Sequence, residues 1–413
     1  MSAFEKCSSL TSIKIPNSVT MIGNSAFSKC TSLTSVTIPN SVSNIGDLTF
    51  YGCTALESVT IPTSVSEIGE YAFWMCTSLK SVTIPNSITE IRKGVFEDCE
   101  SLTSVTIPNS VTIIGSSAFS GCGALSAITI PNSVTEIRGG AFSGCKTLTN
   151  VTIPNSVTVI GGSAFSSCHS LTSVTIPNSV TKIGYGVFQY CKSLTSVIIP
   201  DSVTEIDSDA FFMCSSLASV KIGNSVTQIG ISAFSYCTSL SDVTIGKAVD
   251  IISDEAFWHC SSLASVIIPN SVTEIGTDAF QYCSSLISVN LPSSLKNIGR
   301  HAFDECNRLK DVYYNCENPV ELENNQLFGD NYYYIGACLH VPAVAVEKCK
   351  ITSPWKYFKD IQAYDFSGVE AVSGDTAKTV TARYDLSGSP VDGDYKGLVI
   401  ERYSDGSTKK TVQ

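Results

Sequence analysis

Apolar residues recur along most of the chain with a period of 23 residues. Each repeat carries eight apolar positions, and one set is Ala118, Phe119, Cys122, Leu125, Ile128, Ile130, Val134 and Ile137. The cysteine position is filled at Cys7, Cys30, Cys53, Cys76, Cys99, Cys122, Cys145, Cys168, Cys191, Cys214, Cys237, Cys260, Cys283 and Cys306. A fixed period of this length is typical of a stacked repeat array, because one unit cannot bury its apolar side alone.

The local pattern divides each repeat into four parts. Residues 102–107 alternate apolar and β-branched polar side chains, which predicts a strand, and Pro108 ends it because proline lacks an N–H. A Pro-Asn-Ser turn and a second short extended piece follow. A glycine such as Gly46 or Gly69 comes next, where we expect a positive φ. From there to the cysteine, one or two helical turns are predicted, with Ser or Asp as caps.

Stacking these repeats predicts a right-handed α/β solenoid. One face would be a parallel sheet with strands about 4.8 Å apart, and short helices or turns would lie opposite. Residues 1–310 hold about 14 repeats, of which the first is truncated because the chain enters in the middle of a repeat. We therefore expect a further N-terminal portion.

After Leu309 the register is lost, and the composition changes twice. Residues 311–362 contain an aromatic cluster (Tyr313, Tyr314, Tyr332, Tyr333 and Tyr334), followed by the segments Leu339-His-Val-Pro342 and Trp355-Lys-Tyr-Phe358. These residues are predicted to cap the open core of the solenoid. Residues 363–375 are a small, polar linker. Residues 376–413 predict a small β domain of short strands with Gly and Asp in the turns.

The charge balance and the length of the apolar runs exclude nucleic acid as a partner and a membrane-spanning helix. The chain has 413 residues, 15% of them charged, and a net charge of −11. No basic face is available to neutralise phosphates, so we expect no nucleic acid. No run approaches the roughly 20 apolar residues of a membrane helix, so no transmembrane segment is predicted.

Seventeen cysteines suggest disulfides, but their register suggests otherwise. Stacked cysteines would point the same way, and one per turn cannot surround a metal ion. The pattern favours a column of buried free thiols, since free cysteine is among the most buried residue types. Cys316, Cys338 and Cys349 lie outside the column, and one disulfide among them is an open alternative in an exported protein.

The consensus Leu-x-x-Val-x-Ile-Pro-x-Ser-Val-x-x-Ile-Gly-x-x-Ala-Phe-x-x-Cys-x-x-Leu closely resembles the 23-residue leucine-rich repeats of BspA-like bacterial surface proteins. The resemblance covers residues 1–310, and residues 339–358 are similar to that family's terminal unit. It implies a cell-surface or secreted adhesion module. Its partners would be host extracellular-matrix or cell-surface proteins of the fibronectin and fibrinogen kind.

The tail carries a second resemblance. Tyr384-Asp-Leu-Ser-Gly388, then Lys396-Gly-Leu-Val-Ile400 and a basic end at Lys409 and Lys410 resemble C-terminal sorting domains of the type IX secretion system of Bacteroidetes. This resemblance implies export followed by surface attachment or release. The alternative is a small β appendage without that role.

Two surfaces are candidates for binding. Residues two positions after each Phe become large in consecutive repeats, and the preceding position adds two aromatic residues: Tyr190, Phe212, Met213, Tyr236, Trp258, His259 and Tyr282. Tyr, Trp and Met carry binding energy when they are desolvated. The alternative is that these rings pack on adjacent turns and stiffen the stack.

The second candidate is the outward side of the sheet, which we expect to be concave. Its side chains are Ser81, Thr83, Ser104 and Thr106 in the monotonous half, and Ile198, Lys221, Asp242 and Ile267 later. The alternative for the hydroxyl rows is a solvated, strand-forming face.

Catalysis finds little support, because the four histidines occupy different repeat positions and no nucleophile, phosphate-binding or metal motif is present. No cofactor is predicted. The leading hypothesis is a non-enzymatic surface or secreted adhesion protein that binds proteins. The alternatives are a structural spacer that presents another domain and a carbohydrate-binding accessory protein.

Overall fold

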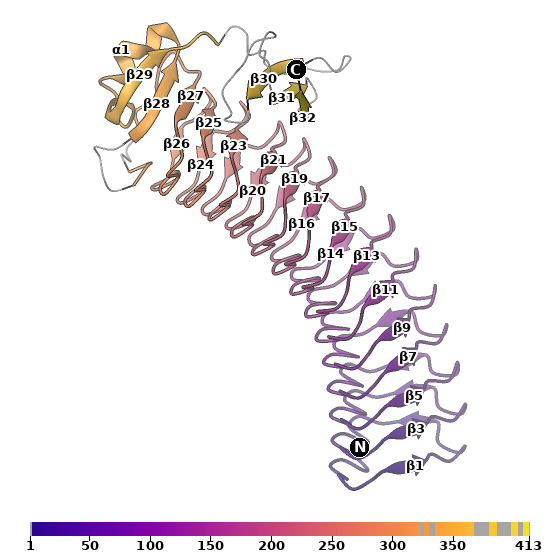
Figure 1. Cartoon of the computed structure of the whole chain (residues 1–413). Coiled ribbons are helices and arrows are strands. Elements are labelled where there is room, and N and C mark those ends of the chain that lie inside the picture. The colour runs from indigo at the N-terminus through magenta and orange to yellow at the C-terminus, as the bar shows by residue number, and fades with distance from the viewer. Residues whose placement is uncertain are drawn as a thin grey trace. The chain divides into compact units, whose positions relative to one another are not determined.

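The computed structural model describes residues 2–322, 326–329, 335–366, 380–385, 398–403 and 408–412. The chain forms two compact units, Met1–Leu217 and Ala218–Gln413. Within each unit, every 23-residue repeat makes one turn of a parallel β-solenoid, as Figure 1 shows. The predicted fold class is confirmed.

Each turn of the first unit carries a three-residue strand and a two-residue strand. The longer strands are β1 (Ser12–Lys14), β3 (Ser35–Thr37), β5 (Ser58–Thr60), β7 (Ser81–Thr83), β9 (Ser104–Thr106), β11 (Ala127–Thr129), β13 (Asn150–Thr152), β15 (Ser173–Thr175) and β17 (Ser196–Ile198). The shorter ones are β2 (Met21–Ile22), β4 (Asn44–Ile45), β6 (Glu67–Ile68), β8 (Glu90–Ile91), β10 (Ile113–Ile114), β12 (Glu136–Ile137), β14 (Val159–Ile160), β16 (Lys182–Ile183) and β18 (Glu205–Ile206). Both kinds match the extended pieces that the sequence predicts.

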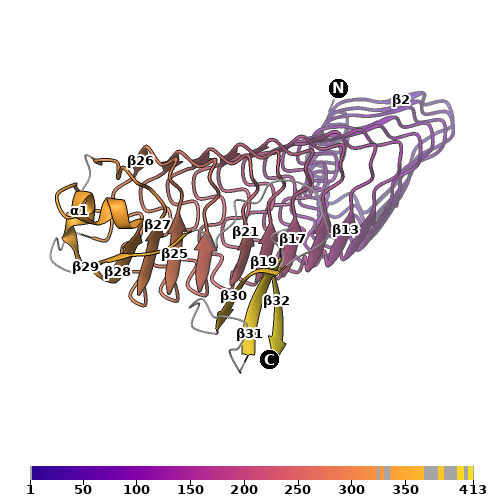
Figure 2. The same ribbon diagram turned by 90° about the horizontal axis from the view of Figure 1, so that it is seen from above.

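The second unit continues the same plan. Its longer strands are β19 (Ser219–Lys221), β21 (Asp242–Thr244), β23 (Ser265–Ile267), β25 (Ser288–Leu291) and β27 (Asp311–Tyr314). Its shorter ones are β20 (Gln228–Ile229), β22 (Ile251–Ile252), β24 (Glu274–Ile275) and β26 (Asn297–Ile298). Figure 2 shows the arrows of β21, β25 and β27 on one side of this unit and β26 on the other.

The register is fixed by the repeat length. Ser35 pairs with Ser58, Val36 with Val59 and Thr37 with Thr60, a shift of one repeat each time. Alternate side chains of a strand point to opposite faces, so each valine faces the core while its neighbours face solvent. The same shift stacks the phenylalanines. In the first unit their ring centroids lie 5.2–5.7 Å apart, from Phe4–Phe27 to Phe188–Phe211.

The segment between the second strand and the cysteine is not helical, contrary to prediction. Residues two before and two after each Phe have left-handed backbones, as in Ser25 (φ 55°) and Lys29 (φ 59°). Alternate N–H groups donate to the next turn: Ser25 N to Asp47 O (2.8 Å), Phe27 N to Thr49 O (2.9 Å) and Lys29 N to Tyr51 O (2.6 Å). An α-helix needs those groups for its own i to i−4 bonds and excludes positive φ. The segment is therefore a run of β-turns bonded between repeats.

The glycine column also has a different cause from the one predicted. The described φ angles of Gly46, Gly69 and Gly115 do not lie in the left-handed region. A Cβ on Gly69 would lie 2.4 Å from Asp47 N, and one on Gly46 would lie 2.6 Å from Asn24 N. Glycine is favoured there because the preceding turn's backbone passes too close for a side chain.

The cysteine column is buried from Cys30 to Cys306, and only its first member, Cys7, is exposed. Thiols of the buried part of the column also make a bond that the sequence did not predict. Cys122 Sγ donates to Phe96 O (3.2 Å), and Cys145 Sγ donates to Phe119 O (3.3 Å). All seventeen cysteines are free thiols, including Cys316, Cys338 and Cys349, so the disulfide alternative is not realised.

Past the last repeat, the parallel sheet of β23, β25 and β27 gains two longer strands. These are β28 (Ile335–Val341) and β29 (Phe358–Ala363), and between them lie η1 (Ala343–Ala345), α1 (Val346–Cys349) and η2 (Trp355–Tyr357). Trp355 is buried, stacks on Tyr314 with a centroid distance of 4.4 Å, and donates Nε1 to Val320 O (2.9 Å). The capping role of residues 311–362 stays a prediction. Tyr332, Tyr333 and Tyr334 lie outside the described residues.

The C-terminal strands form a separate antiparallel sheet. They are β30 (Val380–Asp385), β31 (Leu398–Tyr403) and β32 (Thr408–Val412), in the order β30-β31-β32. The predicted sorting-domain motif at 384–388 is described only for Tyr384 and Asp385, because 386–397 lie outside the described residues.

Candidate binding surfaces

The turn segment of the second unit carries a cluster of four aromatic side chains: Tyr236, Trp258, His259 and Tyr282. We refer to these as the second-unit cluster. Three of them have left-handed backbones, with φ of 57° at Tyr236, 58° at His259 and 60° at Tyr282. For residues other than glycine this conformation costs roughly 1–2 kcal/mol. Large aromatic residues here therefore run against the local backbone preference, and their presence needs another reason.

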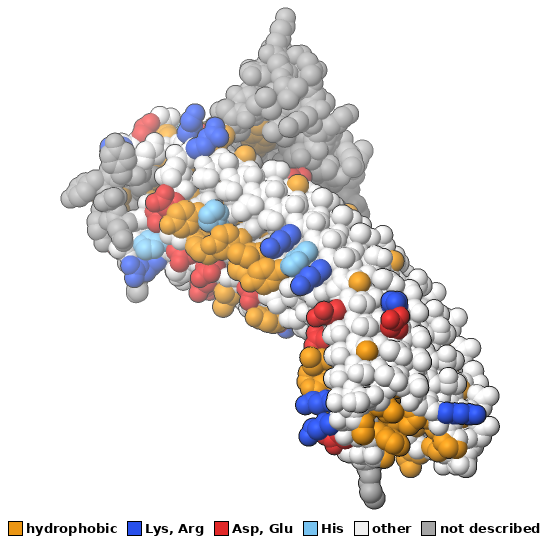
Figure 3. Space-filling model, turned by 60° about the horizontal axis from the view of Figure 1, so that its bottom comes forward, with side chains coloured by type: hydrophobic (Ala, Val, Ile, Leu, Met, Phe, Trp, Pro, Cys, Tyr) orange, Lys and Arg blue, Asp and Glu red, His pale blue; other side chains and the backbone are white. Residues whose placement is uncertain are grey.

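The rings of this cluster pack on one another from turn to turn. Tyr236 and His259 stack with centroids 4.9 Å apart and planes 22° apart, and His259 and Tyr282 stack at 5.7 Å and 26°. Trp258 meets Tyr236 edge-on at 4.8 Å. Figure 3 shows hydrophobic side chains gathered on this face of the molecule. The ring faces that Tyr236, His259 and Tyr282 turn towards one another are therefore covered.

Polar groups hold the rim of the second-unit cluster in place. Trp258 Nε1 donates to Gln281 Oε1 (2.9 Å), and Gln281 Nε2 donates to Asp304 Oδ2 (3.1 Å). Nδ1 of His259 is buried and has no hydrogen-bond partner among the described residues. Tyr282 is 40% exposed, while Tyr236, Trp258 and His259 are half-buried. The cluster is therefore fixed in position but accessible.

The remaining predicted aromatic residues belong to the first unit. Tyr190 meets Phe212 edge-on with centroids 5.5 Å apart, and Met213 is half-buried. Both Tyr190 (φ 61°) and Met213 (φ 56°) again occupy left-handed positions. The structure thus brings Tyr190 and Phe212 together.

A second group of rings in the first unit escaped the sequence analysis. Tyr51 and Trp74 stack with centroids 4.6 Å apart, and Tyr71 lies 5.5 Å from Trp74. Trp74 Nε1 donates to Asp98 Oδ2 (3.1 Å), and Lys29 Nζ lies 5.5 Å from the centre of the Tyr51 ring. The available signal was that Tyr51 and Trp74 each follow a repeat phenylalanine, one period apart.

The outward side of the longer strands is exposed, as predicted, but uneven. Ser81 pairs with Ser104, and Thr83 with Thr106, in two exposed hydroxyl rows. Ile198, also in the first unit, is 67% exposed. In the second unit, Lys221 and Asp242 are exposed and Ile267 is half-buried. These residues supply no ring or cavity that would anchor a ligand.

The glutamate row on the shorter strands is occupied by ion pairs. Arg138 bridges Glu90 (3.1 Å) and Glu136 (3.2 Å), and Lys182 bridges Glu205 (2.9 Å) and Asp207 (3.1 Å). Exposed pairs of this kind contribute about 0–1 kcal/mol each. They offset part of the row's negative charge, which fits a structural surface better than an acid–base pair.

The sheet past the last repeat places a Cys, a His and an Asp in contact. His340 Nε2 lies 2.8 Å from Asp311 Oδ1, and His340 Nδ1 lies 3.9 Å from Cys338 Sγ. Desolvation, and then the carboxylate of Asp360, raise the pKa of the Cys338 thiol to about 12. The thiol therefore stays protonated at neutral pH, whereas a nucleophilic cysteine needs a lowered pKa. No sequence motif joins these three residues.

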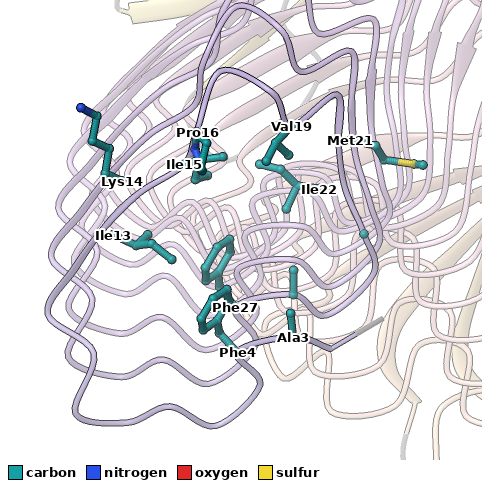
Figure 4. Close-up of a pocket in the computed structure, with 12 residues that line it drawn as sticks. Ala3, Phe4, Ile13, Lys14, Ile15, Pro16, Val19, Met21, Ile22 and Phe27 are labelled. Atoms are coloured by element: carbon teal, nitrogen blue, oxygen red, sulfur yellow. The ribbon is translucent and has the colours of Figure 1, made fainter.

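Among the described residues, no three or more His, Cys, Asp and Glu side chains are placed to hold a metal ion. No helix in the described part of the chain is long and apolar enough to cross a membrane. An apolar hollow of about 350 Å³ opens at the first turn, where Phe4, Ile13, Val19, Met21 and Phe27 lie around it (Figure 4). Its lining continues the core columns, since Phe4 stacks on Phe27 at 5.3 Å, so we interpret it as the end of the core.

Comparison with known proteins identifies the family to which this chain belongs. A family model described as a BspA type leucine-rich repeat region matches residues 1–126, 112–241 and 204–332. The chain belongs to the BspA-type leucine-rich repeat family. This bacterial family is surface-associated and typically non-enzymatic. Among curated proteins, none matches this chain.

Solved structures agree with this family. A leucine-rich repeat protein from Bacteroides ovatus is 37% identical to this chain and superimposes with a TM-score of 0.71. The match covers 78% of this chain and 86% of the Bacteroides ovatus chain. A leucine-rich cell surface protein from Faecalibacterium prausnitzii is 35% identical, with 72% and 83% coverage and a TM-score of 0.51. A leucine-rich repeat protein from Eubacterium ventriosum is 26% identical, with 72% and 82% coverage and a TM-score of 0.53. None of these matches bears on the sorting-domain resemblance.

Proposed function

We propose that this BspA-type protein is a non-enzymatic adhesion protein, displayed on the cell surface or secreted, that binds protein partners through the second-unit cluster. The observation that carries the proposal is an aromatic residue at the same left-handed position in three consecutive turns: Tyr236, His259 and Tyr282. Glycine would relieve the backbone there, and the same position is Gly121 and Gly144 in earlier turns. Keeping rings at this cost is expected where they contribute to binding.

The packing of the rings favours a protein over a sugar as the partner. A sugar stacks on an exposed ring face, but the stacked faces of Tyr236, His259 and Tyr282 cover one another. The exposed edges carry the positive side of the ring quadrupole, and the phenol groups donate hydrogen bonds. Backbone carbonyls and carboxylates of a protein surface match these groups. We propose host or microbial extracellular and cell-surface proteins as the partner class.

A variant of four substitutions tests the proposal without disturbing the fold. Tyr236→Ser, Trp258→Ser, His259→Ser and Tyr282→Ser place at each position a residue that the chain already uses there, at Ser167 and Ser120. Binding of the chain to a panel that includes fibronectin and fibrinogen is measured by interferometry. Loss of clustered aromatic anchors is expected to weaken binding by about tenfold or more.

The first-unit pair provides the matched control. Tyr51→Ser with Trp74→Ser removes two stacked rings from the repeat position that Trp258 also occupies, and is expected to leave binding unchanged. Equal binding by the four-site variant and the wild type would contradict the proposal. A wild type that binds nothing on the panel favours the alternative of a structural spacer.

Export is the second part of the proposal. The antiparallel strands β30, β31 and β32 support the resemblance of residues 376–413 to a type IX sorting domain. Fusion of residues 363–413 to a reporter in a Bacteroidetes strain would test it. Surface delivery that disappears when type IX secretion is disabled is the expected result, and unchanged delivery would overturn it.

A further inference from the structure

Three basic side chains occupy one column in three successive turns of the first unit. Lys146, His169 and Lys192 each directly follow a column cysteine. The turns are joined behind them by Ser170 N to Lys146 O (3.1 Å) and Ser193 N to His169 O (3.2 Å). The backbone thus holds the three side chains one strand spacing apart, about 4.8 Å. Lys146 and Lys192 are exposed, and His169 is half-buried.

No acidic side chain neutralises this group among the described residues. Two other lysines of the unit are ion-paired, Lys80 with Glu57 (2.7 Å) and Lys182 with Glu205 (2.9 Å). None of the ion pairs in the described part of the chain involves Lys146, His169 or Lys192. In the same column, the nearest acid towards the N-terminus is Glu100, two turns before Lys146. Figure 3 shows a histidine flanked by two basic side chains on this face.

The electrostatics of His169 agree with this geometry. Burial lowers its pKa, and the charges of Lys192 and Lys146 lower it further. The charges that act on the ring are thus both positive, although the whole chain has a net charge of −11. Like charges held this close repel, and a bound anion would remove the repulsion.

We propose that Lys146, His169 and Lys192 form a binding site for a sulfated glycan. Two lysines with a protonatable histidine between them, in line at one-turn spacing, match a linear polyanion, with salt-dependent contacts from each charged group. Each cation is followed by a hydroxyl residue (Thr147, Ser170 and Ser193), which suits the hydroxyl and sulfate oxygens of a sugar chain. The site does not depend on the adhesion function proposed above.

An acidic peptide fits this site less well. An extended peptide places side chains of one face about 6.8 Å apart, which is out of step with cations about 4.8 Å apart. It would also need free backbone groups to pair with. At these positions the N–H groups of Ser170 and Ser193 already bond to the preceding turn. The glycan is therefore the partner that the geometry favours.

A heparin-derived octasaccharide is the probe for the full chain, and calorimetry at 50 mM and 150 mM salt is the measurement. The wild type is expected to bind it, with a slope of log K against log salt of about −1.5 for the two lysine contacts at pH 7.5, and a steeper slope at pH 5.5, where His169 adds a third contact. The variant Lys146→Gln, His169→Gln, Lys192→Gln is expected to bind at least about tenfold more weakly. Lys182→Gln removes the same charge from an ion-paired position and is expected to change binding less than about twofold.

Proton linkage separates this site from general charge attraction. Protonation of His169 adds a third positive charge, so affinity is expected to rise as the pH falls from 7.5 to 5.5, and His169→Gln alone should remove most of that rise. The chemically desulfated octasaccharide should not bind. The proposal is overturned if the wild type does not bind the sulfated probe, if Lys182→Gln weakens it as much as the triple variant does, or if poly-glutamate binds more tightly.

Discussion

The inner and outer sides of the turn segment follow the same 23-residue period but obey different rules. On the inside, Phe and Cys recur almost without change and are buried, as Phe257 and Cys260 are. On the outside, one residue before that cysteine, the column holds Gly144, Ser167, Tyr236 and His259 in different turns. The inner column is buried between neighbouring repeats in every turn, whereas the outer column packs between turns only where it carries rings. Variation on the outside is therefore where a repeat protein can encode a partner.

The backbone itself does not distinguish the aromatic turns from the plain ones. Gly144 N donates to Ser166 O (2.8 Å), and His259 N donates to Gln281 O at the same distance. Ser167 and Tyr282 have φ of 58° and 60°. Since the turn forms equally well with small residues, the rings of the second-unit cluster are not needed to make it.

The largest expected effect is alkaline unfolding driven by the inner column. Burial raises the pKa of Cys53, Cys168 and Cys283 from 9.0 to about 12, so folded thiols stay protonated where unfolded ones ionise. Stability is then complete below pH 9 and falls as the pH rises towards 12. At pH 10 each thiol costs about 1.4 kcal/mol. Four such thiols already offset the lower end of the roughly 5–15 kcal/mol of a typical fold, so circular dichroism should show unfolding that begins near pH 10.

A variant with fewer column thiols checks the cause of that unfolding. With Cys122, Cys145 and Cys168 changed to Ala, the stability lost between pH 8 and pH 10 should shrink by about 4 kcal/mol. Urea unfolding at the two pH values gives the difference for each protein. An unchanged loss would mean that lysine or tyrosine ionisation, and not the inner column, causes the alkaline unfolding.

Neighbouring residues of one turn provide the next contrast. Phe257 is fully buried and stacks on Phe234 (5.3 Å) and Phe280 (5.2 Å), so Phe257→Ala should cost about 3–5 kcal/mol. Trp258→Ser, on the outer side, should cost less than about 1.5 kcal/mol from lost ring contacts. Urea midpoints measure both, and similar costs would show that the outer rings belong to the structural core.

The thiol bonds make a smaller, position-specific prediction. A serine at position 145 finds the carbonyl of Phe119 as an acceptor, because Cys145 Sγ already donates to it at 3.3 Å. Cys145→Ser should therefore cost about 1–2 kcal/mol, the low end for a buried hydroxyl. Cys7→Ser, the same change at the exposed end of the column, should be neutral in thermal unfolding. A larger loss at position 7 than at 145 would contradict the buried-column interpretation.

The smallest predicted effects compare glycine at two left-handed positions. Ser167→Gly should stabilise the first unit by about 0.5 kcal/mol, because relief of the backbone is partly offset by unfolded-state entropy. Tyr282→Gly should gain less or lose stability, since it also removes the stack on His259. If both variants gain equally in thermal unfolding, the rings contribute nothing to stability and binding becomes the sole reason for them.

Much of the fold was predictable because stacking repeats the same contact every 23 residues. The apolar columns, the strand positions and the burial of Cys30 to Cys306 all follow from this period. The aromatic candidates were visible for the same reason, as departures from a monotonous column. Cys338 and His340 could not be connected to Asp311 from the sequence, because the intervening loop hides the register of β27 and β28.

Tertiary structure alone decided how the turn segment is bonded. The sequence from Gly115 to Cys122 is compatible with helical turns, and a single repeat offers no other partner for its N–H groups. In the stack, the N–H groups of Ser117, Phe119 and Gly121 donate to carbonyls of the next turn. Hydrogen bonds between turns replace those within a helix, and they set the left-handed positions where rings face solvent. The 23-residue period is visible in the sequence, whereas the hydrogen bonds between turns form only when the repeats are stacked.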